Sequence, residues 1–409
     1  MRYFKQRSEI RRGMLVAAVL AALLGLLAAC GGDDPTPTTP PVDTRATPTS
    51  DAPAKAAWEI EWDETLAKAQ EEGELSAALG SGATRDFRPL YKHFQDKFGI
   101  RVILSGGSGS AASQRILAER AAGQFTVDVT QTGASSANGV LIPNNVIAPL
   151  EPLLFRPDVL DKSAWYQGKF WWGDKTLKYV FIYGANHNNP GIVINTDLVD
   201  GSEITSYWDL LDPKYNGMHV SGDLAAAGGS STFHFLFGHP ALGPEFLMRY
   251  ATETGLAMIS DARVAASWMT EGTKAISMHL GGTYSQLIDD LAERGLPVRK
   301  LTHSMIEGTT LSVGSIDQIM ALADPPNPNA QKLFLNWLLS PEGQLTAQNV
   351  ANDIDSFRND IPKDMVTPEE RRQDGIDYIF VATDPDYQAL TQESFDFAAE
   401  VAAAWRATQ

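Results

Sequence analysis

Short apolar runs and amphipathic stretches alternate along most of this chain. Residues 63–72 have helical periodicity and are followed by Gly73, and residues 75–79 form a short apolar run. The elements predicted next are a helix over 85–98, a strand over 101–104, a helix through residue 122 and a strand over 127–129. Strands that alternate with helices predict mostly parallel sheets with right-handed crossovers.

The same alternation restarts near residue 218 and continues to about residue 301. The rest of the chain is predicted to be mainly helical, with a strand near 309–313. Two α/β lobes joined by extended crossings fit this pattern better than one very large sheet. Aromatic residues crowd the segment 165–183 between the two halves, where packing of a hinge region is favoured over stacking on a ligand.

The N-terminus has the pattern of an export signal. A basic start precedes an apolar run of 14 residues, 14–27, which is short for a membrane span and typical of a signal peptide. The run ends in LAACG, with Cys30 as the only cysteine of the chain. We therefore expect a signal peptide over 1–29 and lipidation of Cys30. The alternative is a free thiol behind an uncleaved anchor helix.

Residues 30–57 are expected to form a disordered tether, because they are rich in Pro, Thr, Ala and Asp and poor in large apolar side chains. A tether behind a lipidated cysteine would anchor a globular body outside the membrane. The adjacent Arg11 and Arg12 leave open whether export follows the general or the twin-arginine route.

Charge narrows the choice of partners. The 409 residues carry a formal charge of −17, and without residues 1–29, which hold five bases and one acid, the net charge is −21. A chain this acidic is repelled by phosphate backbones, so we expect no nucleic-acid partner.

Polar turns rich in glycine, serine and threonine follow the predicted strands. In an open α/β sheet such turns lie at the carboxyl ends of strands, where ligands bind, and each precedes a helix whose first N–H groups attract anions. Helix capping alone would also explain any single turn. The candidate ligand-binding residues in these turns are Ser81, Thr84, Arg85, Gly107, Ser108, Ser110, Thr132, Gly229, Ser230, Ser231 and Thr283.

Two enzyme patterns are present only in part. Residues 107–112 fit the dinucleotide pattern G-x-G-x-x-A, and Asp128 follows at a suitable spacing, but the pattern comes after the second strand. A serine-hydrolase elbow around Ser108 would need glycine where Ser110 stands. The seven histidines show no metal-binding spacing. We expect no enzyme activity and no cofactor, and an exported enzyme that uses the Ser108 turn is the rival hypothesis.

Four segments resemble a known family. They are ERAAGQFTVDV (119–129), IVINTDLV (192–199), ITSYWDLLDPKYNG (204–217) and NAQKLFLNWLLSPEGQ (329–344). Across about residues 58–350 the chain resembles the extracellular solute-binding proteins of ABC importers, in the ferric-iron-type branch of the type II periplasmic-binding fold.

The resemblance implies two lobes that close over a ligand by hinge motion, with crossings near 192–195 and 309–313. The implied division is lobe 1 over 58–194 and 309–325, lobe 2 over 195–308, and a C-terminal helical segment over 326–409 that packs on the lobes. The implied partners are a small ligand and the permease subunits of an importer, and we expect an extracytoplasmic, membrane-anchored monomer.

The residues of the chain leave two ligand classes open. Ferric members of the branch present two adjacent tyrosines on the second lobe, whereas this chain has one, Tyr284, and it lacks their histidine after the first strand. Tyr284 with Glu307 would make a sparse ferric site. We therefore expect a small anionic solute, with Tyr284 and Glu307 among the ligand-binding residues, and keep ferric iron coordinated by Tyr284 as the alternative.

Overall fold

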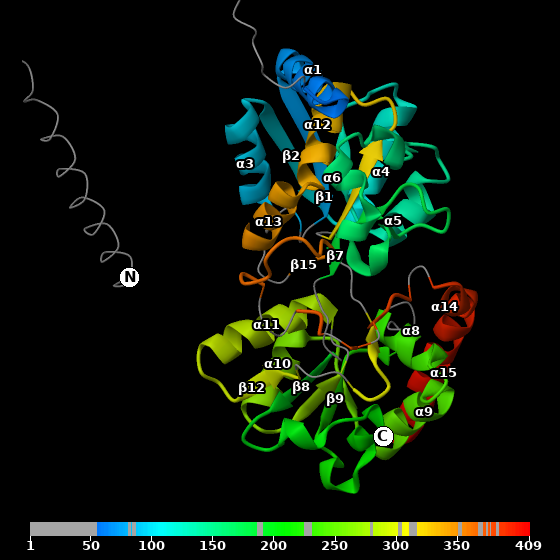
Figure 1. Cartoon of the computed structure of the whole chain (residues 1–409). Coiled ribbons are helices and arrows are strands. Elements are labelled where there is room, and N and C mark those ends of the chain that lie inside the picture. The colour runs from blue at the N-terminus through cyan, green and yellow to red at the C-terminus, as the bar shows by residue number, and fades with distance from the viewer. Residues whose placement is uncertain are drawn as a thin grey trace, which may run out of the picture. The chain divides into compact units, whose positions relative to one another are not determined.

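The computed structural model describes residues 55–80, 83, 87–185, 191–224, 231–278, 281–301, 305–310, 317–350, 354–366, 371–373, 375–376, 378–381 and 384–409. The predicted signal peptide, Cys30 and the tether up to residue 54 lie outside them. The described residues belong to one compact unit, 55–409, which contains two separate sheets. We call the sheets, with the helices packed on them, lobe 1 and lobe 2 (Figure 1).

Within the described residues, seven strands form the lobe 1 sheet. The main path is β2-β1-β3-β14-β6-β5, with β4 paired to β14. The bounds are β1 (Glu74–Gly80), β2 (Arg101–Gly107), β3 (Val129–Gln131), β4 (Ile147–Ala148), β5 (Trp171–Trp172), β6 (Phe181–Ile182) and β14 (Gln318–Leu322). Strands β1, β2 and β3 are parallel, whereas β14 runs antiparallel to β3, β4 and β6.

Helices cover both faces of this sheet. Figure 1 shows α1 beside α12, with α3 and α13 in the same lobe. The bounds are α1 (Ala57–Glu72), α3 (Arg88–Phe98), α4 (Gly109–Ala121), α5 (Ala134–Ser136), α6 (Pro157–Leu160), α12 (Pro328–Leu338) and α13 (Pro341–Val350). Helices α1 and α3 end where Gly73 and Gly99 adopt left-handed backbone angles, φ +74° and +71°. The predicted stop at Gly73 is confirmed.

The lobe 2 sheet has the strand order β10-β9-β11-β8-β12. The bounds are β8 (Ile192–Asn195), β9 (His219–Ser221), β10 (Ala257–Met258), β11 (Ile276–Met278) and β12 (Val298–Lys300). Its helices are α8 (Ser231–Gly238), α9 (Gly243–Glu253), α10 (Ala262–Thr270), α11 (Gly281–Glu293), α14 (Pro385–Ala389) and α15 (Thr391–Ala407). Side chains of α10 and α11 form one apolar cluster, and those of α8, α9 and α15 share another.

The α/β class with two lobes is confirmed, but the sheets are mixed rather than mostly parallel. Strand β8 pairs antiparallel with β11 and β12, and β14 enters lobe 1 antiparallel to its neighbours. Both strands follow a segment that comes from the other lobe, so they enter the sheet from the opposite direction to the strands of the βαβ units.

Two small sheets lie on the segments that connect the lobes. Strand β7 (Gly184–Ala185), between β6 and β8, pairs with β15 (Asp355–Ser356). Strand β13 (Thr309–Thr310), between β12 and β14, pairs with β16 (Tyr378–Ile379). The last part of the chain thus contributes strands as well as helices.

The aromatic segment before the crossing is buried. Trp165, Phe170, Trp171, Trp172 and Phe181 belong to the lobe 1 core, and Trp165 lies edge-on to Phe181 at 5.1 Å between ring centroids. The prediction that these rings pack the structure is confirmed. No helix among the residues the structure describes has the length and apolarity needed to cross a membrane.

Candidate functional site

Two of the predicted turns meet at the carboxyl edge of the lobe 1 sheet. Ser108 is the N-cap of α4, and its hydroxyl accepts a hydrogen bond from the Ala111 N–H at 3.2 Å. The next residue, Gly109, lies against the turn after β3: a Cβ on Gly109 would be 2.0 Å from the Thr132 carbonyl oxygen. Only glycine fits this position, and its absence of a side chain brings the start of α4 onto the Thr132 turn.

The polar side chains of this junction differ in exposure. Ser108 and Ser110 are exposed, whereas Thr132 is buried and its hydroxyl accepts a 3.4 Å hydrogen bond from Ser113. Gly133 follows with φ +99°, a backbone angle that side chains disfavour. The exposed serine hydroxyls and the first N–H groups of α4 form a polar rim on buried, well-packed turns.

A buried hydrogen-bond network next to the end of β3 supports this polar rim. The Gln131 side chain, at the end of β3, accepts a 2.7 Å bond from the Tyr91 hydroxyl of α3. Its amide nitrogen donates to the Tyr183 hydroxyl at 2.8 Å and to the Gln318 carbonyl at 3.1 Å. Burial raises the pKa of both tyrosines, so the hydroxyls stay protonated. The network fixes α3, β3, β14 and the crossing after β6 relative to one another.

Sequence reasoning missed Gln131 and Tyr183 as parts of this edge. Gln131 stood within a predicted polar turn, and Tyr183 was assigned to aromatic packing. Gln131 and Gln318 alone are 187 residues apart in the sequence, so no local pattern connects the four groups.

Arg115 of α4 is a second base that the sequence analysis did not name. Its Nη2 donates to the Ser105 hydroxyl at 2.5 Å, and its Nε lies 3.5 Å from Glu119. The arginine is therefore partly neutralised by a carboxylate one helical turn away.

Several predicted site residues cannot be placed. Ser81, Thr84, Arg85, Gly229 and Ser230 lie outside the described residues. Ser231 is the first residue of α8 and Thr283 lies in the first turn of α11, but their side chains are not among those that the structure describes. In lobe 1, Gly107 ends β2 and is partly buried.

In lobe 2, Tyr284 points into the protein. Its side chain is only 3% exposed, lies in an apolar cluster with Val193 and Ile288, and accepts a 2.8 Å hydrogen bond from the Ser277 hydroxyl of β11. Burial raises the pKa of Tyr284 above its ordinary value. As placed, the phenol is a neutral, buried group.

Glu307 lies on the segment that leads out of lobe 2, and its side chain is hydrogen-bonded to another part of the same lobe. Its carboxylate accepts a short hydrogen bond from the Ser206 hydroxyl and one from the Tyr207 N–H at 3.2 Å. These groups start the 3₁₀ helix Tyr207–Leu211, so Glu307 caps that helix. The carboxylate is already engaged by two donors.

Asp128, which completes the dinucleotide pattern, has a structural role. It is fully buried and accepts hydrogen bonds from the N–H groups of Ser76 at 2.7 Å and Asn327 at 2.8 Å. It ties β1 to the start of α12 and is not placed to bind a ribose.

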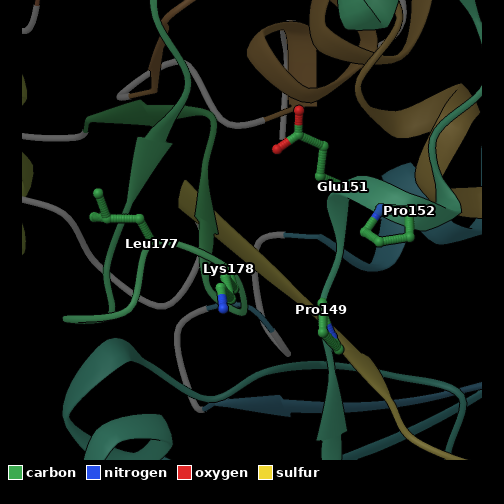
Figure 2. Close-up of a pocket in the computed structure, with 5 residues that line it drawn as sticks. All are labelled: Pro149, Glu151, Pro152, Leu177 and Lys178. Carbon is green, nitrogen blue, oxygen red and sulfur yellow. The ribbon is translucent and has the colours of Figure 1, made fainter.

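A separate pocket of about 450 Å³ opens on lobe 1. Figure 2 shows the residues that line it: Pro149, Glu151, Pro152, Leu177 and Lys178. None of the candidate ligand-binding residues that the structure describes is among these five. Among the described residues, no group of three or more His, Cys, Asp or Glu side chains could hold a metal ion.

Solved structures with the same fold are known. The Bordetella ferric binding protein is 16% identical with a TM-score of 0.57, covering 80% of this chain and 98% of its own. An ABC transporter protein from Clostridium perfringens is 14% identical with a TM-score of 0.56, covering 80% and 99%. The spermidine/putrescine ABC transporter substrate-binding protein of Streptococcus pneumoniae is 14% identical with a TM-score of 0.50, again covering 80% and 99%. At these identities the similarity shows the fold alone.

A search of curated protein sequences found no significant match. The sequence model of the bacterial extracellular solute-binding proteins, in contrast, matches residues 90–364, which is more than half of the chain. The matched stretch runs from α3 to just after β15. It contains the strands of both lobe sheets except β1, and the two segments that cross between the lobes. The chain therefore belongs to the bacterial extracellular solute-binding protein family.

Proposed function

We propose that this protein captures a small anionic solute between its two lobes and delivers it to the permease of an ABC importer. The observation that carries the proposal is the contact between the N-terminus of α4 and the Thr132 turn. At this contact the backbone of Gly109 lies directly against the Thr132 carbonyl. Such a junction presents hydroxyls and helix N–H groups at the carboxyl edge of the sheet, where ligands of open α/β sheets bind.

The proposed ligand-contacting residues are those of the polar turns. In lobe 1 the described ones are Gly107, Ser108, Ser110 and Thr132. The exposed hydroxyls of Ser108 and Ser110 are hydrogen-bond donors without charge, which suits an anion bound mainly by dipoles. In the closed form, turns of lobe 2 would complete the site from the other side.

Ferric iron is the second candidate, because structures similar to this one include ferric binding proteins. A ferric site needs anionic oxygen ligands. Tyr284 would have to leave its contact with Ser277 and lose its proton, and burial makes that loss more costly. This geometry favours the anion over the metal.

Tyr284→Phe is expected to separate the two candidates. The variant should lose only about 0.5–1.5 kcal/mol of folding stability, since it removes one neutral hydrogen bond. Titration calorimetry with phosphate as the anionic probe should give the same affinity for variant and wild type.

Ferric citrate is the matched probe for the metal. A visible absorption band that forms with ferric ion in the wild type and disappears in Tyr284→Phe would contradict the anion proposal. Turnover of ester or phosphoester substrates by the wild type would instead favour the exported enzyme that uses the Ser108 turn.

We further propose that Cys30 is lipidated and holds the protein at the outer face of the membrane. Cys30→Ala is then expected to give a folded protein that is released from membranes, because the diacyl anchor forms on this cysteine alone. Sedimentation of membranes in high salt, with detection of the protein in both fractions, measures the release. Continued sedimentation of Cys30→Ala with membranes would contradict lipid anchoring.

A further inference from the structure

The final part of the chain crosses between the two lobes. Residues 365–409 lie beyond the stretch that matches the family, and we call them the C-terminal strap. Its helices α14 and α15 pack on lobe 2, where the Trp405 indole donates to the Leu256 carbonyl at 2.7 Å and Val401 is fully buried. Its earlier part contacts lobe 1.

Strand β16 and the two residues after it contact both cores. Tyr378 and Phe380 belong to the lobe 1 core, and Phe380 lies 6.0 Å from the ring of Trp171. Val381 belongs to the lobe 2 core, and Ile379 packs against it. Because successive residues of an extended segment point to opposite sides, this segment presents one face to each lobe.

The lobe 1 end of the strap is held by Arg372. Its guanidinium donates to the carbonyls of Asp355 at 3.1 Å and Ser356 at 2.8 Å, and its N–H donates to the Asp355 carboxylate at 2.8 Å. The guanidinium also lies over the rings of Tyr166 and Phe357, 4.6 and 4.8 Å from their centroids. The side chain is 9% exposed, so these contacts are largely shielded from water.

Asp355 and Ser356 form β15, which pairs with β7 on the first crossing between the lobes. Strand β16 pairs with β13 on the second crossing. The strap therefore contacts the second connecting segment directly, through β16, and the first one indirectly, because Arg372 holds its partner strand β15. A hinge moves by backbone rotation in such segments, so what pairs with them limits their motion.

We propose that the C-terminal strap limits the range over which the two lobes open, with β16 as a wedge between the cores and Arg372 as the anchor on lobe 1. The consequence of this limit for solute binding rests on the proposed function. A protein that opens more widely populates its binding-competent state less and binds solute more weakly. The limit on opening itself does not depend on which solute is bound.

Distance measurement between spin labels tests the proposal without any solute. Cys30 is the only cysteine, so a Cys30→Ser background accepts two labels, at Lys92→Cys in α3 of lobe 1 and at Glu293→Cys in α11 of lobe 2. Both positions are exposed. Arg372→Gln removes the anchor and is expected to broaden the distribution of distances between the labels.

Arg371→Gln is the matched control. Among the described residues, the neighbouring Arg371 donates to the carbonyls of Val366 and Asp364, a few positions earlier in the sequence. Its loss should leave the distance distribution as in the wild type. Arg372→Lys keeps the charge but loses the two-carbonyl contact, and an intermediate distribution is expected. It carries the test if Arg372→Gln does not fold.

The proposal that the strap limits opening would be overturned if folded Arg372→Gln had the same distance distribution as the wild type. If Arg372→Gln does not fold, the same holds for Arg372→Lys. Broadening by Arg371→Gln to the same degree would also overturn it, because the effect would then not depend on the anchor. Failure to bind phosphate or ferric ion bears only on the proposed function, since neither probe is present in this experiment.

Discussion

Gly109→Ala is expected to destabilise lobe 1 by about 3 kcal/mol, a large effect for one added methyl group. The new Cβ would be 2.0 Å from the Thr132 carbonyl oxygen and 3.3 Å from the Ser136 hydroxyl. The Thr132 turn cannot move freely, because the preceding Gln131 is hydrogen-bonded to Tyr91 and to Tyr183. Helix α4 is held by the contacts of Ser113 with Thr132 and of Arg115 with Ser105. The strain therefore has no easy release.

Gly107→Ala is the matched control two residues earlier. Among the described residues, a Cβ there would meet nothing closer than the Ala111 Cβ at 4.0 Å, an ordinary contact. Urea unfolding should place this variant within about 0.5 kcal/mol of the wild type. If Gly109→Ala unfolds at the wild-type urea concentration, the close approach between α4 and the Thr132 turn is wrong.

The same pair of variants separates folding from binding. Gly107→Ala keeps the fold, so a loss of phosphate affinity in this variant would report on solute that approaches the backbone at the end of β2. Unchanged affinity would place the solute elsewhere along the turns. The expected difference in folding stability between the two variants would stay the same.

Local signals account for what the sequence predicted well. The first three strands and the helices between them follow from short apolar runs and from stops such as Gly73, and the observed bounds differ by only a few residues. Strand β2 extends to Gly107, beyond the predicted end at residue 104, because Gly80 and Gly107 still pair. Pairing extends a strand past the residues whose apolar pattern predicts it.

Non-local contacts account for what the sequence did not predict. Strand β14 pairs antiparallel with β3, and nothing in its own residues specifies that neighbour. Strands β15 and β16 have two residues each, too few for a periodic pattern. The hydroxyl of buried Tyr284 is bonded to Ser277, which lies between Ile276 and Met278 in β11. The alternation of apolar and polar residues predicts which face of the strand Ser277 is on, but not which residue it contacts.

The second large effect concerns acid. His219 of β9 is fully buried, lies edge-on to Tyr250 at 5.4 Å between ring centroids, and neither ring nitrogen has a hydrogen-bond partner of ordinary geometry among the described residues. Burial lowers the pKa of His219 to about 4, helped by the charge of Lys274 and opposed by the Leu210 backbone. In the unfolded chain the pKa of this side chain returns to its ordinary value of 6.5.

Between pH 6.5 and 4 the unfolded state therefore binds a proton that folded lobe 2 does not. The stability that neutral His219 allows is fully present above pH 6.5 and is lost as the pH falls, by about 3 kcal/mol in total. Asp128 in lobe 1 has the opposite sign: burial raises its pKa to about 6 from 3.8, so its contribution is fully present below pH 3.8 and is lost as the pH rises through 6. The two groups partly cancel in the stability of the whole protein.

His219→Phe isolates the histidine from this cancellation. Phenylalanine keeps a buried ring beside Tyr250 but binds no proton, so its stability relative to the wild type should rise as the pH falls from 6.5 to 4. Urea unfolding at four pH values across this range measures the difference, and subtraction removes the Asp128 contribution because both proteins contain it. Parallel stability curves for wild type and His219→Phe would show that the buried ring does not control the response of lobe 2 to acid.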